Sequence, residues 1–253
     1  MAEFSKSALD RLGERLRSSE RPAHDDRATY DAYRASFAPA VIEVERLCAD
    51  AIPFLQGRTA RLKTLESTIA KLRRGSYRLS QIQDVAGVRI AVDDLSGQEV
   101  ALEILGAELS ILRITDYRDR PQNGYRALHL IVESTFGPLV ELQLRTEVQD
   151  IWANTCETLA GMLDLGIKYG GGPDWIREAL GELSRNGQEG ETVQKYRQVL
   201  LGQIGAQATE SSSLPRTDEL RREFDVLGDA FLESYTQEVR DLVWRAGQQR
   251  QTS

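Results

Sequence analysis

Residues 125–145, YRALHLIVESTFGPLVELQLR, contain the pattern that decides the fold. Two runs with apolar side chains at alternate positions, Tyr125–Glu133 and Leu139–Arg145, flank a turn that contains Gly137 and Pro138. A period of two is typical of β-strands, and a short glycine-containing connection favours an antiparallel hairpin. The sequence therefore predicts a β-hairpin near the middle of the chain.

Strand-like and helical segments alternate before this hairpin. The runs Val85–Val92 and Leu109–Ile114 predict two further strands, and Val100–Glu108 between them has helical spacing. Apolar residues recur at helical spacing from Ala28 to Ile52, where Pro39 predicts a kink or a split. We expect an α+β fold in which N- and C-terminal helices flank a mixed β-sheet.

Composition divides the chain into three predicted parts. Residues 1–27 are polar and predict a short frayed helix followed by a linker. Residues 28–170 hold the N-terminal helix and the sheet. The stretch Gly170–Pro173 is the clearest break, and residues 171–253 predict helices with a serine-rich joint at Ser211–Ser213.

The bulk composition is that of an ordinary soluble globular protein. The chain has 253 residues, 41% apolar and 28% charged, with a net charge of -7. It contains no run long enough to cross a bilayer and no signal-peptide core, so we expect a cytoplasmic protein that binds no membrane. Acidic charge argues against DNA binding. Two histidines and two distant cysteines, Cys48 and Cys156, argue against a histidine or cysteine metal centre.

A basic cluster between Arg58 and Arg74 runs against this acidic balance. Its cations are Arg58, Arg61, Lys63, Lys71, Arg73 and Arg74, with Glu66 as the single acid. Such a concentration suggests a site for a small polyphosphate, held by Lys63, Lys71 and a helix N-terminus near Ser67. A solvated cationic helix face is the alternative, and the residues alone leave both open.

Two acids lie in otherwise apolar, strand-like runs. Asp84 lies in QDVAGVRIAV and Glu141 in PLVELQLRT, where alternation places Glu141, Gln143 and Arg145 on one strand face. Two carboxylates that hold a metal, beside cations that hold phosphates, are the parts that phosphoryl-type transfer needs. A strand-start role for Asp84 and a solvent-exposed face around Glu141 are the alternatives.

The segment NGYRALHL offers groups for a nucleotide. Alternation places Tyr125, Ala127 and His129 on one strand face, with Asn123 in the preceding turn. A tyrosine beside a groove provides a stacking surface for a base. His129 suits a phosphate or a sugar hydroxyl, although a lone strand histidine is more often structural.

Taken in order, five segments resemble the RelA/SpoT family of alarmone synthetases. They are RLKTLESTIAKLRR, DVAGVRI, NGYRALHL, VELQLRT and WANTCETLA, within about residues 57–165. The family pattern has Arg-x-Lys and Ser-x3-Lys, Asp-x2-Gly-x-Arg, Gly-Tyr-x3-His and Glu-x-Gln-x-Arg-Thr. The resemblance implies a nucleotidyltransferase-like synthetase domain within residues 28–170.

The resemblance also implies a reaction and a role for each matching residue. The β,γ-pyrophosphate of ATP would pass to the ribose 3′-hydroxyl of GDP or GTP, leaving AMP. Asp84 and Glu141 would hold Mg²⁺, and Glu141 would assist deprotonation of the attacking hydroxyl. The residues implied for ATP are Arg61, Lys63, Ser67, Lys71, Arg74 and Arg89, of which Arg61 and Arg89 would sandwich the adenine. The residues implied for the acceptor are Asn123, Tyr125, His129 and Gln143, with Tyr125 stacked on the purine.

Departures from the family pattern bear on the acceptor. Pro121 replaces the lysine that commonly stands four residues before the tyrosine, and Trp152-Ala153 continues with Asn154. Together with IKYGGGP, Ile167–Pro173, these features are similar to toxin-type small alarmone synthetases. Some of those make adenosine alarmones from ADP or ATP, and others pyrophosphorylate the 3′ end of tRNA. Membership of that group would imply a neutralising antitoxin protein.

Three functions therefore stay open. The first is an alarmone synthetase. We expect it to have no hydrolase domain, because the short polar N-terminal region leaves no room for one. The second is a toxin acting on tRNA, which would need an exposed basic track; the candidates are Arg113, Arg118, Arg120 and Arg126. The third is a catalytically inactive binding module, which the presence of both carboxylates disfavours.

Overall fold

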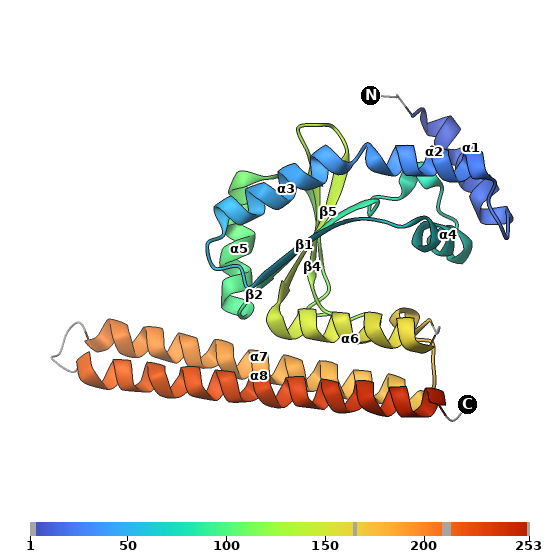
Figure 1. Ribbon diagram of the computed structural model, residues 1–253. Coiled ribbons are helices and arrows are strands. Elements are labelled where there is room, and N and C mark those ends of the chain that lie inside the picture. The colour runs from blue at the N-terminus through green and yellow to red at the C-terminus, as the bar shows by residue number, and fades with distance from the viewer. Residues whose placement is uncertain (1–3, 164–165, 209–213, 252–253) are drawn as a thin grey trace. The chain divides into compact units, whose positions relative to one another are not determined.

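A five-stranded sheet of order β1-β2-β5-β4-β3 forms the centre of the fold (Figure 1). The computed structural model describes residues 4–163, 166–208 and 214–251. The strands are β1 Gly57–Leu62, β2 Ala86–Val92, β3 Ser110–Asp116, β4 Leu128–Glu133 and β5 Leu139–Thr146. Strands β4 and β5 pair antiparallel, so the predicted hairpin is confirmed. The expected α+β class, with a mixed sheet and flanking helices, is also confirmed.

Eight α-helices accompany the sheet in the described part of the chain. They are α1 Lys6–Ser18, α2 His24–Ala35, α3 Ala38–Ala51, α4 Leu65–Arg74, α5 Leu95–Glu108, α6 Glu147–Leu163, α7 Asp174–Ala208 and α8 Leu214–Gln251. None of these helices is long and apolar enough to cross a membrane. The predicted joint at Ser211–Ser213 lies outside the described residues.

The chain divides into two compact units. The first consists of Met1–Ile90, Ala101–Thr115 and Leu128–Leu144, and the second of Ala91–Val100, Asp116–Ala127 and Arg145–Ser253. The division into parts 1–27, 28–170 and 171–253 stays a prediction.

The first helix is an integral part of the first unit, so the prediction of a frayed helix within residues 1–27 was wrong. Ser5 caps α1 by accepting a hydrogen bond from the amide of Ala8 at 3.2 Å. An apolar stripe, Leu9, Leu12 and Leu16, is buried in a cluster with residues of α2 and α4. Figure 1 shows α1 lying against these helices. Burial of this stripe stabilises a helix that looked polar in composition.

The helix expected from Ala28 to Ile52 is split, as Pro39 predicted. Pro39 stands in the first turn of α3, where its missing N–H leaves no hydrogen bond unmade. Helix α2 ends just before it at Ala35.

The strand expected from Tyr125 begins only at Leu128, so its predicted start was wrong. Asn123 and Gly124 have φ of 52° and 87°, and the amide of Tyr125 donates to the Gln122 carbonyl at 2.9 Å. Two successive residues with positive φ form a tight turn of the type that Asn-Gly favours. Tyr125 therefore closes a turn and does not lie within a strand.

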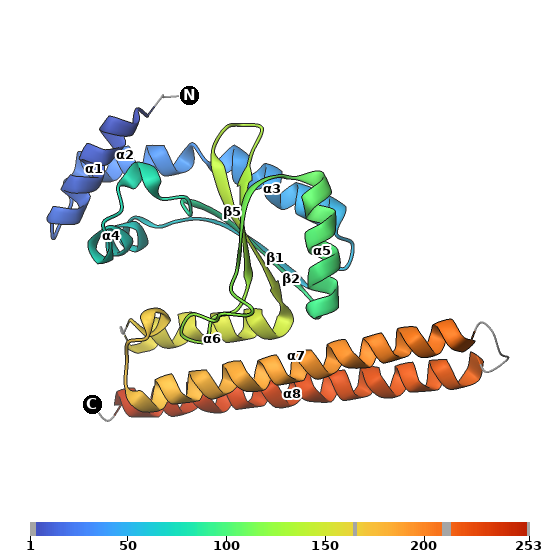
Figure 2. The ribbon, with the colours of Figure 1, turned by 180° about the vertical axis from the view of Figure 1, so that it is seen from behind.

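In the second unit, α7 and α8 run side by side as an antiparallel pair (Figure 2). Their close approach depends on Gly190. A Cβ placed there would lie 2.0 Å from the Phe231 ring, so no larger side chain fits without movement.

We expect Gly190→Ala to lower the free energy of unfolding by about 1–3 kcal/mol, because the Phe231 ring must shift. Gly161→Ala is the matched control, since a Cβ at this position in α6 meets nothing within 4 Å. That substitution should stabilise the helix by up to about 1 kcal/mol. Denaturant unfolding of both variants measures the difference, and equal stability would contradict the packing described here.

Candidate functional site

Two ammonium groups converge on one carboxylate in the first unit. Lys63 follows β1, Lys71 lies on α4, and Asp84 lies two residues before β2. Lys63 Nζ lies 2.7 Å from Asp84 Oδ2, and Lys71 Nζ lies 2.9 Å from Asp84 Oδ1. The side chains are only 14%, 26% and 19% exposed, respectively. The basic cluster is therefore more than a solvated helix face at these two positions.

Local hydrogen bonds fix the segment that carries the two lysines. The amide of Lys63 donates to the Val85 carbonyl at 2.8 Å, which holds the end of β1 beside the start of β2. The buried Tyr30 hydroxyl donates to the Lys63 carbonyl at 2.9 Å and also shares a hydrogen bond with Thr68 of α4. Tyr30 thus ties β1 to the helix that carries Lys71.

Ser67 lies in the first turn of α4, but Thr64 is the residue that caps the helix. Thr64 Oγ1 accepts from the Ser67 amide at 3.2 Å and lies 3.0 Å from Ser67 Oγ. Ser67 is exposed. The helix therefore begins at Leu65 with Thr64 as its N-cap, and its N-terminus lies near Ser67 as predicted.

Glu141 forms a second polar group on the β4–β5 hairpin. Register places Ile131 opposite Glu141 and His129 opposite Gln143. His129 Nδ1 lies 3.1 Å from Glu141 Oε1, and Gln143 Nε2 donates to Glu141 Oε2 at 2.8 Å. The Glu141 side chain is 19% exposed. Glu141 is therefore held by donors on both oxygens.

The two carboxylates lie close enough to influence each other. Burial and the charge of Asp84 raise the pKa of Glu141, but the hydrogen bond and charge of His129 outweigh them, and the pKa lies below its ordinary value. Burial likewise raises the pKa of Asp84, and the charges and hydrogen bonds of Lys63 and Lys71 bring it below its ordinary value. Both groups are therefore ionised at neutral pH.

This arrangement has a consequence for stability at acid pH. A carboxyl with a lowered pKa stabilises the fold fully above its unfolded pKa, and the contribution is lost as pH falls through the folded pKa. For Asp84 that loss begins below its ordinary value of 3.8.

We expect the free energy of unfolding to fall less steeply below about pH 4 in Asp84→Asn than in the wild type. Chemical unfolding at a series of pH values measures the two slopes. Identical slopes would show that Asp84 is not held in the ionised form.

The three arginines predicted for ATP differ in burial. Arg74, in the last turn of α4, and Arg61, on β1, are exposed, whereas Arg89, on β2, is half-buried. A Cβ at Gly87 would lie 3.9 Å from Arg61 Cγ. Since Gly87 and Arg89 share a strand face, Arg61 and Arg89 lie on the same face of the sheet.

Of the residues predicted for the acceptor, Tyr125 and Asn123 lie in the second unit. Arg145 stacks over the Tyr125 ring at 5.4 Å, and its Nη2 donates to the Tyr125 hydroxyl at 3.2 Å. Trp152 also contacts the Tyr125 ring, with centroids 6.3 Å apart. Asn123 lies beside Gly170, where a Cβ would be 3.0 Å from Asn123 Oδ1. The remaining two, His129 and Gln143, instead contact Glu141 in the first unit.

Three arginines form ion pairs that the sequence pattern does not indicate. Arg145 donates to Asp150 Oδ1 at 2.8 Å, which orients its guanidinium. Arg126, a candidate for an exposed tRNA track, is 4% exposed and is ion-paired with Glu191 of α7. The prediction that Arg126 is exposed was wrong, because its guanidinium is buried against the carboxylate of Glu191. Arg118 forms ion pairs with Asp116 and Glu99.

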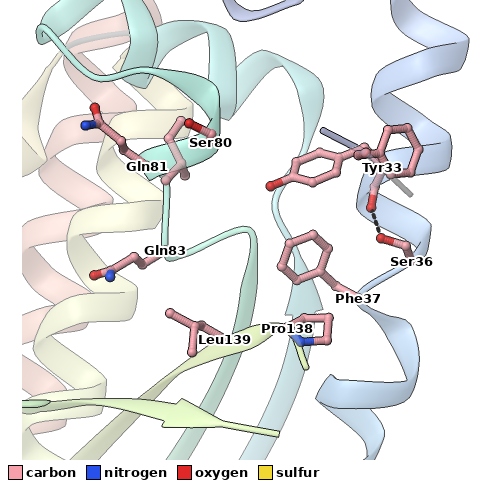
Figure 3. Close-up of a pocket in the computed structure, with 10 residues that line it drawn as sticks. Tyr33, Ser36, Phe37, Ser80, Gln81, Gln83, Pro138 and Leu139 are labelled. Atoms are coloured by element: carbon pink, nitrogen blue, oxygen red, sulfur yellow. Dashed lines mark hydrogen bonds between the residues drawn. The ribbon is translucent and has the colours of Figure 1, made fainter. Parts of the chain in front are cut away.

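A separate cavity of about 630 Å³ lies in the first unit (Figure 3). Tyr33 and Phe37 line one side, and Gln83 and Leu139 lie across from them. Among the described residues, none of those predicted for the site lines this cavity. It therefore does not belong to the charged site.

The donor set around Asp84 and Glu141 fits Mg²⁺, which prefers carboxylate oxygens. The described residues contain no cluster of three or more potential ligands from histidine, cysteine, aspartate and glutamate. A metal here would therefore take one or two protein carboxylates and complete its shell with phosphate oxygens and water, as Mg²⁺ commonly does.

Comparison with known proteins finds a family that this chain resembles. Residues 60–159 match the family described as "Region found in RelA / SpoT proteins". The protein Rv1366 of Mycobacterium tuberculosis is 35% identical over 188 residues, covering 68% of this chain and 65% of that protein. GTP pyrophosphokinase YwaC of Bacillus subtilis is 33% identical over 111 residues, covering 38% of this chain and 53% of that protein. The chain thus spans less than two thirds of these relatives.

The fold has a solved counterpart. The small alarmone synthetase 1 from Bacillus subtilis matches with a TM-score of 0.56 at 23% identity, over 72% of this chain and 99% of that one. The resemblance to the RelA/SpoT family and its synthetase fold is therefore confirmed. The roles of the individual site residues stay predictions.

Proposed function

We propose that this chain transfers the β,γ-pyrophosphate of ATP to the ribose 3′-hydroxyl of a purine nucleotide. The observation that carries the proposal is the convergence of Lys63 and Lys71 on Asp84, with Glu141 in electrostatic contact. Relatives named GTP pyrophosphokinase support the same reaction class. The products would be guanosine or adenosine alarmones.

The lysines act on the phosphates. A pyrophosphoryl group in transfer gathers negative charge on its oxygens, so fixed cations lower the barrier more than an activated nucleophile does. In the structure the two ammonium groups neutralise Asp84. When ATP binds, its phosphate oxygens would accept these donors, and Ser67 and Arg74 would extend the contact from α4.

The carboxylates would then be free to hold Mg²⁺. When bound, the ion supplies charge neutralisation on the phosphates. Glu141 would take the proton of the acceptor 3′-hydroxyl as the oxygen forms a bond to the β-phosphorus. AMP would leave with the electron pair of the P–O bond that breaks between the α- and β-phosphates. Donation from His129 and Gln143 orients Glu141 for this role.

The direct test incubates the protein with γ-labelled ATP, Mg²⁺ and one acceptor at a time: GDP, GTP, ADP, ATP or tRNA. We expect label in a purine nucleotide together with an equal amount of AMP. Label in tRNA alone would replace this function with the toxin activity on the tRNA 3′ end. Hydrolysis without transfer, or no reaction with any acceptor, would contradict the proposal.

The finer features inferred from the family resemblance stay predictions. These are the absence of hydrolase activity, a neutralising antitoxin partner and a cytoplasmic location. The burial of Arg126 and the ion pairs of Arg118 weaken the proposed tRNA track.

Tyr125 should act on the acceptor and not on ATP. We expect Tyr125→Ala to raise the acceptor KM about tenfold or more while leaving the ATP KM nearly unchanged, because a stacked base loses its aromatic partner. Tyr125→Phe keeps the ring and should remain close to the wild type. Steady-state kinetics with each substrate varied in turn provides the measurement. A selective rise in the ATP KM would show that Tyr125 acts on ATP and not on the acceptor.

A further inference from the structure

A buried polar cluster lies behind Tyr125 and Arg145 in the second unit. Its members are Gln98, Arg126, Thr146, Gln149 and Glu191, none more than 4% exposed. Gln98 lies in α5, Thr146 at the end of β5, and Gln149 in α6. Arg126 lies in the segment just before β4, and Glu191 comes from α7. We refer to these five residues as the buried cluster.

Glu191 is the centre of the buried cluster. Arg126 Nη1 donates to its Oε2, and Thr146 Oγ1 donates to its Oε1. Gln149 Nε2 also donates to Oε1 at 3.3 Å. The side-chain oxygen of Gln149, Oε1, in turn accepts from the Thr146 backbone amide at 3.3 Å and from Gln98 Nε2 at 3.0 Å. Both oxygens of a carboxylate with no solvent exposure are therefore occupied.

Two of the residues that Glu191 holds are each next to one member of the stacked pair. Arg126 directly follows Tyr125, and Thr146 directly follows Arg145. Successive side chains of a β-strand point in opposite directions, so Thr146 of β5 faces away from Arg145. Arg126 directly follows the turn that Tyr125 closes. The buried cluster therefore holds the two backbone segments that bring Tyr125 and Arg145 together at 5.4 Å.

Helix α7 also contacts the turn that carries Tyr125 and the neighbouring helix α6. Ser184 Oγ donates to the Gly124 carbonyl at 2.7 Å, and Trp152 Nε1 of α6 donates to the Leu180 carbonyl at 2.9 Å. At Gly187 a Cβ would lie 2.8 Å from Val148 Cγ1 and 3.0 Å from Arg126 Nη2, so a larger side chain would crowd both groups. Helix α7 is thus attached directly to the turn that carries Tyr125.

We propose that Glu191 is a positioning residue for the acceptor side of the site, acting through Arg126 and Thr146. This inference rests on the proposed function, which assigns the acceptor base to Tyr125. Without the Glu191 charge, Arg126 would be a buried cation without a counter-charge. It would have to move toward water, and the Tyr125 backbone would move with it. Helix α7, beyond the matched family region, would then be part of the acceptor site.

The test compares Glu191→Gln with Glu189→Gln, an exposed residue on the same helix. In Glu191→Gln we expect the acceptor KM to rise about tenfold to a hundredfold while the ATP KM stays within about twofold. Amide hydrogen exchange over residues 117–127, which include the bonded Tyr125 amide, should become faster. Glu189→Gln should change neither quantity.

Three results would overturn the proposal: an acceptor KM that does not change, an equal rise in the acceptor KM and the ATP KM, or unchanged amide hydrogen exchange over residues 117–127. If Glu191→Gln does not fold, Arg126→Lys, which keeps the positive charge, is measured and interpreted in the same way. If the wild type transfers to no acceptor, the proposed function fails by itself. The exchange comparison then decides alone whether Glu191 holds the Tyr125 segment.

Discussion

Glu141→Gln should reduce pyrophosphate transfer by about a hundredfold to a thousandfold while the protein remains folded. The substitution removes the negative charge but keeps the size and one oxygen of the side chain. His129 Nδ1 can still donate to that oxygen, as it does to Glu141 Oε1 at 3.1 Å. We expect a large loss because the amide of the variant provides no negative charge for a metal ion and no base for the attacking hydroxyl.

The matched control is Glu133→Gln, at the exposed end of β4, the other strand of the hairpin. It should retain full transfer, and both variants should unfold at nearly the wild-type temperature. Transfer is measured as labelled product per enzyme at saturating substrates. Near-normal turnover in Glu141→Gln would remove this residue from the reaction.

Asp84→Asn should separate the contribution of Lys63 and Lys71 to the stability of the fold from their contribution to phosphate binding. Without the Asp84 charge, the Lys63 and Lys71 ammonium groups face each other partly buried, which should destabilise the fold by about 1–3 kcal/mol. The same groups become more available for phosphate. We therefore expect ATP to bind several-fold more tightly without Mg²⁺, and Mg²⁺-dependent transfer to fall about a hundredfold or more.

Calorimetric titration of ATP with and without Mg²⁺ measures the first effect, and the labelled assay measures the second. Asp50→Asn is the control, because its carboxylate forms an exposed helix pair with Arg46 at 2.7 Å. Such a pair contributes only about 0.3–0.5 kcal/mol. Weaker ATP binding without Mg²⁺ in Asp84→Asn would show that the lysines do not contact the phosphates.

The elements with strong local patterns were predictable from the sequence. The hairpin followed from alternation on both sides of a glycine turn, and the split at Pro39 followed from the missing amide proton. The convergence of Lys63, Lys71 and Asp84 was also foreseen in part. The motif order indicated one site, but only the crossing of β1, α4 and β2 brings these three side chains within hydrogen-bond distance.

Long-range burial was not predictable in the same way. Residues 1–27 look polar because only Leu9, Leu12 and Leu16 face the core, and a narrow stripe changes composition little. Arg126 looked like a surface cation because its partner, Glu191, lies 65 residues away in the chain. The strand start at Tyr125 was misjudged because Asn123 and Gly124 favour a tight turn over continued extension.

We propose that Asp84 and Glu141 together hold one divalent ion beside ATP. Electron paramagnetic resonance of Mn²⁺, titrated into the protein with a non-hydrolysable ATP analogue, measures this binding without requiring turnover. We expect one tightly bound Mn²⁺ in the wild type and in Glu133→Gln, and clearly weaker binding in both Asp84→Asn and Glu141→Gln. Wild-type Mn²⁺ affinity in either carboxylate variant would contradict it.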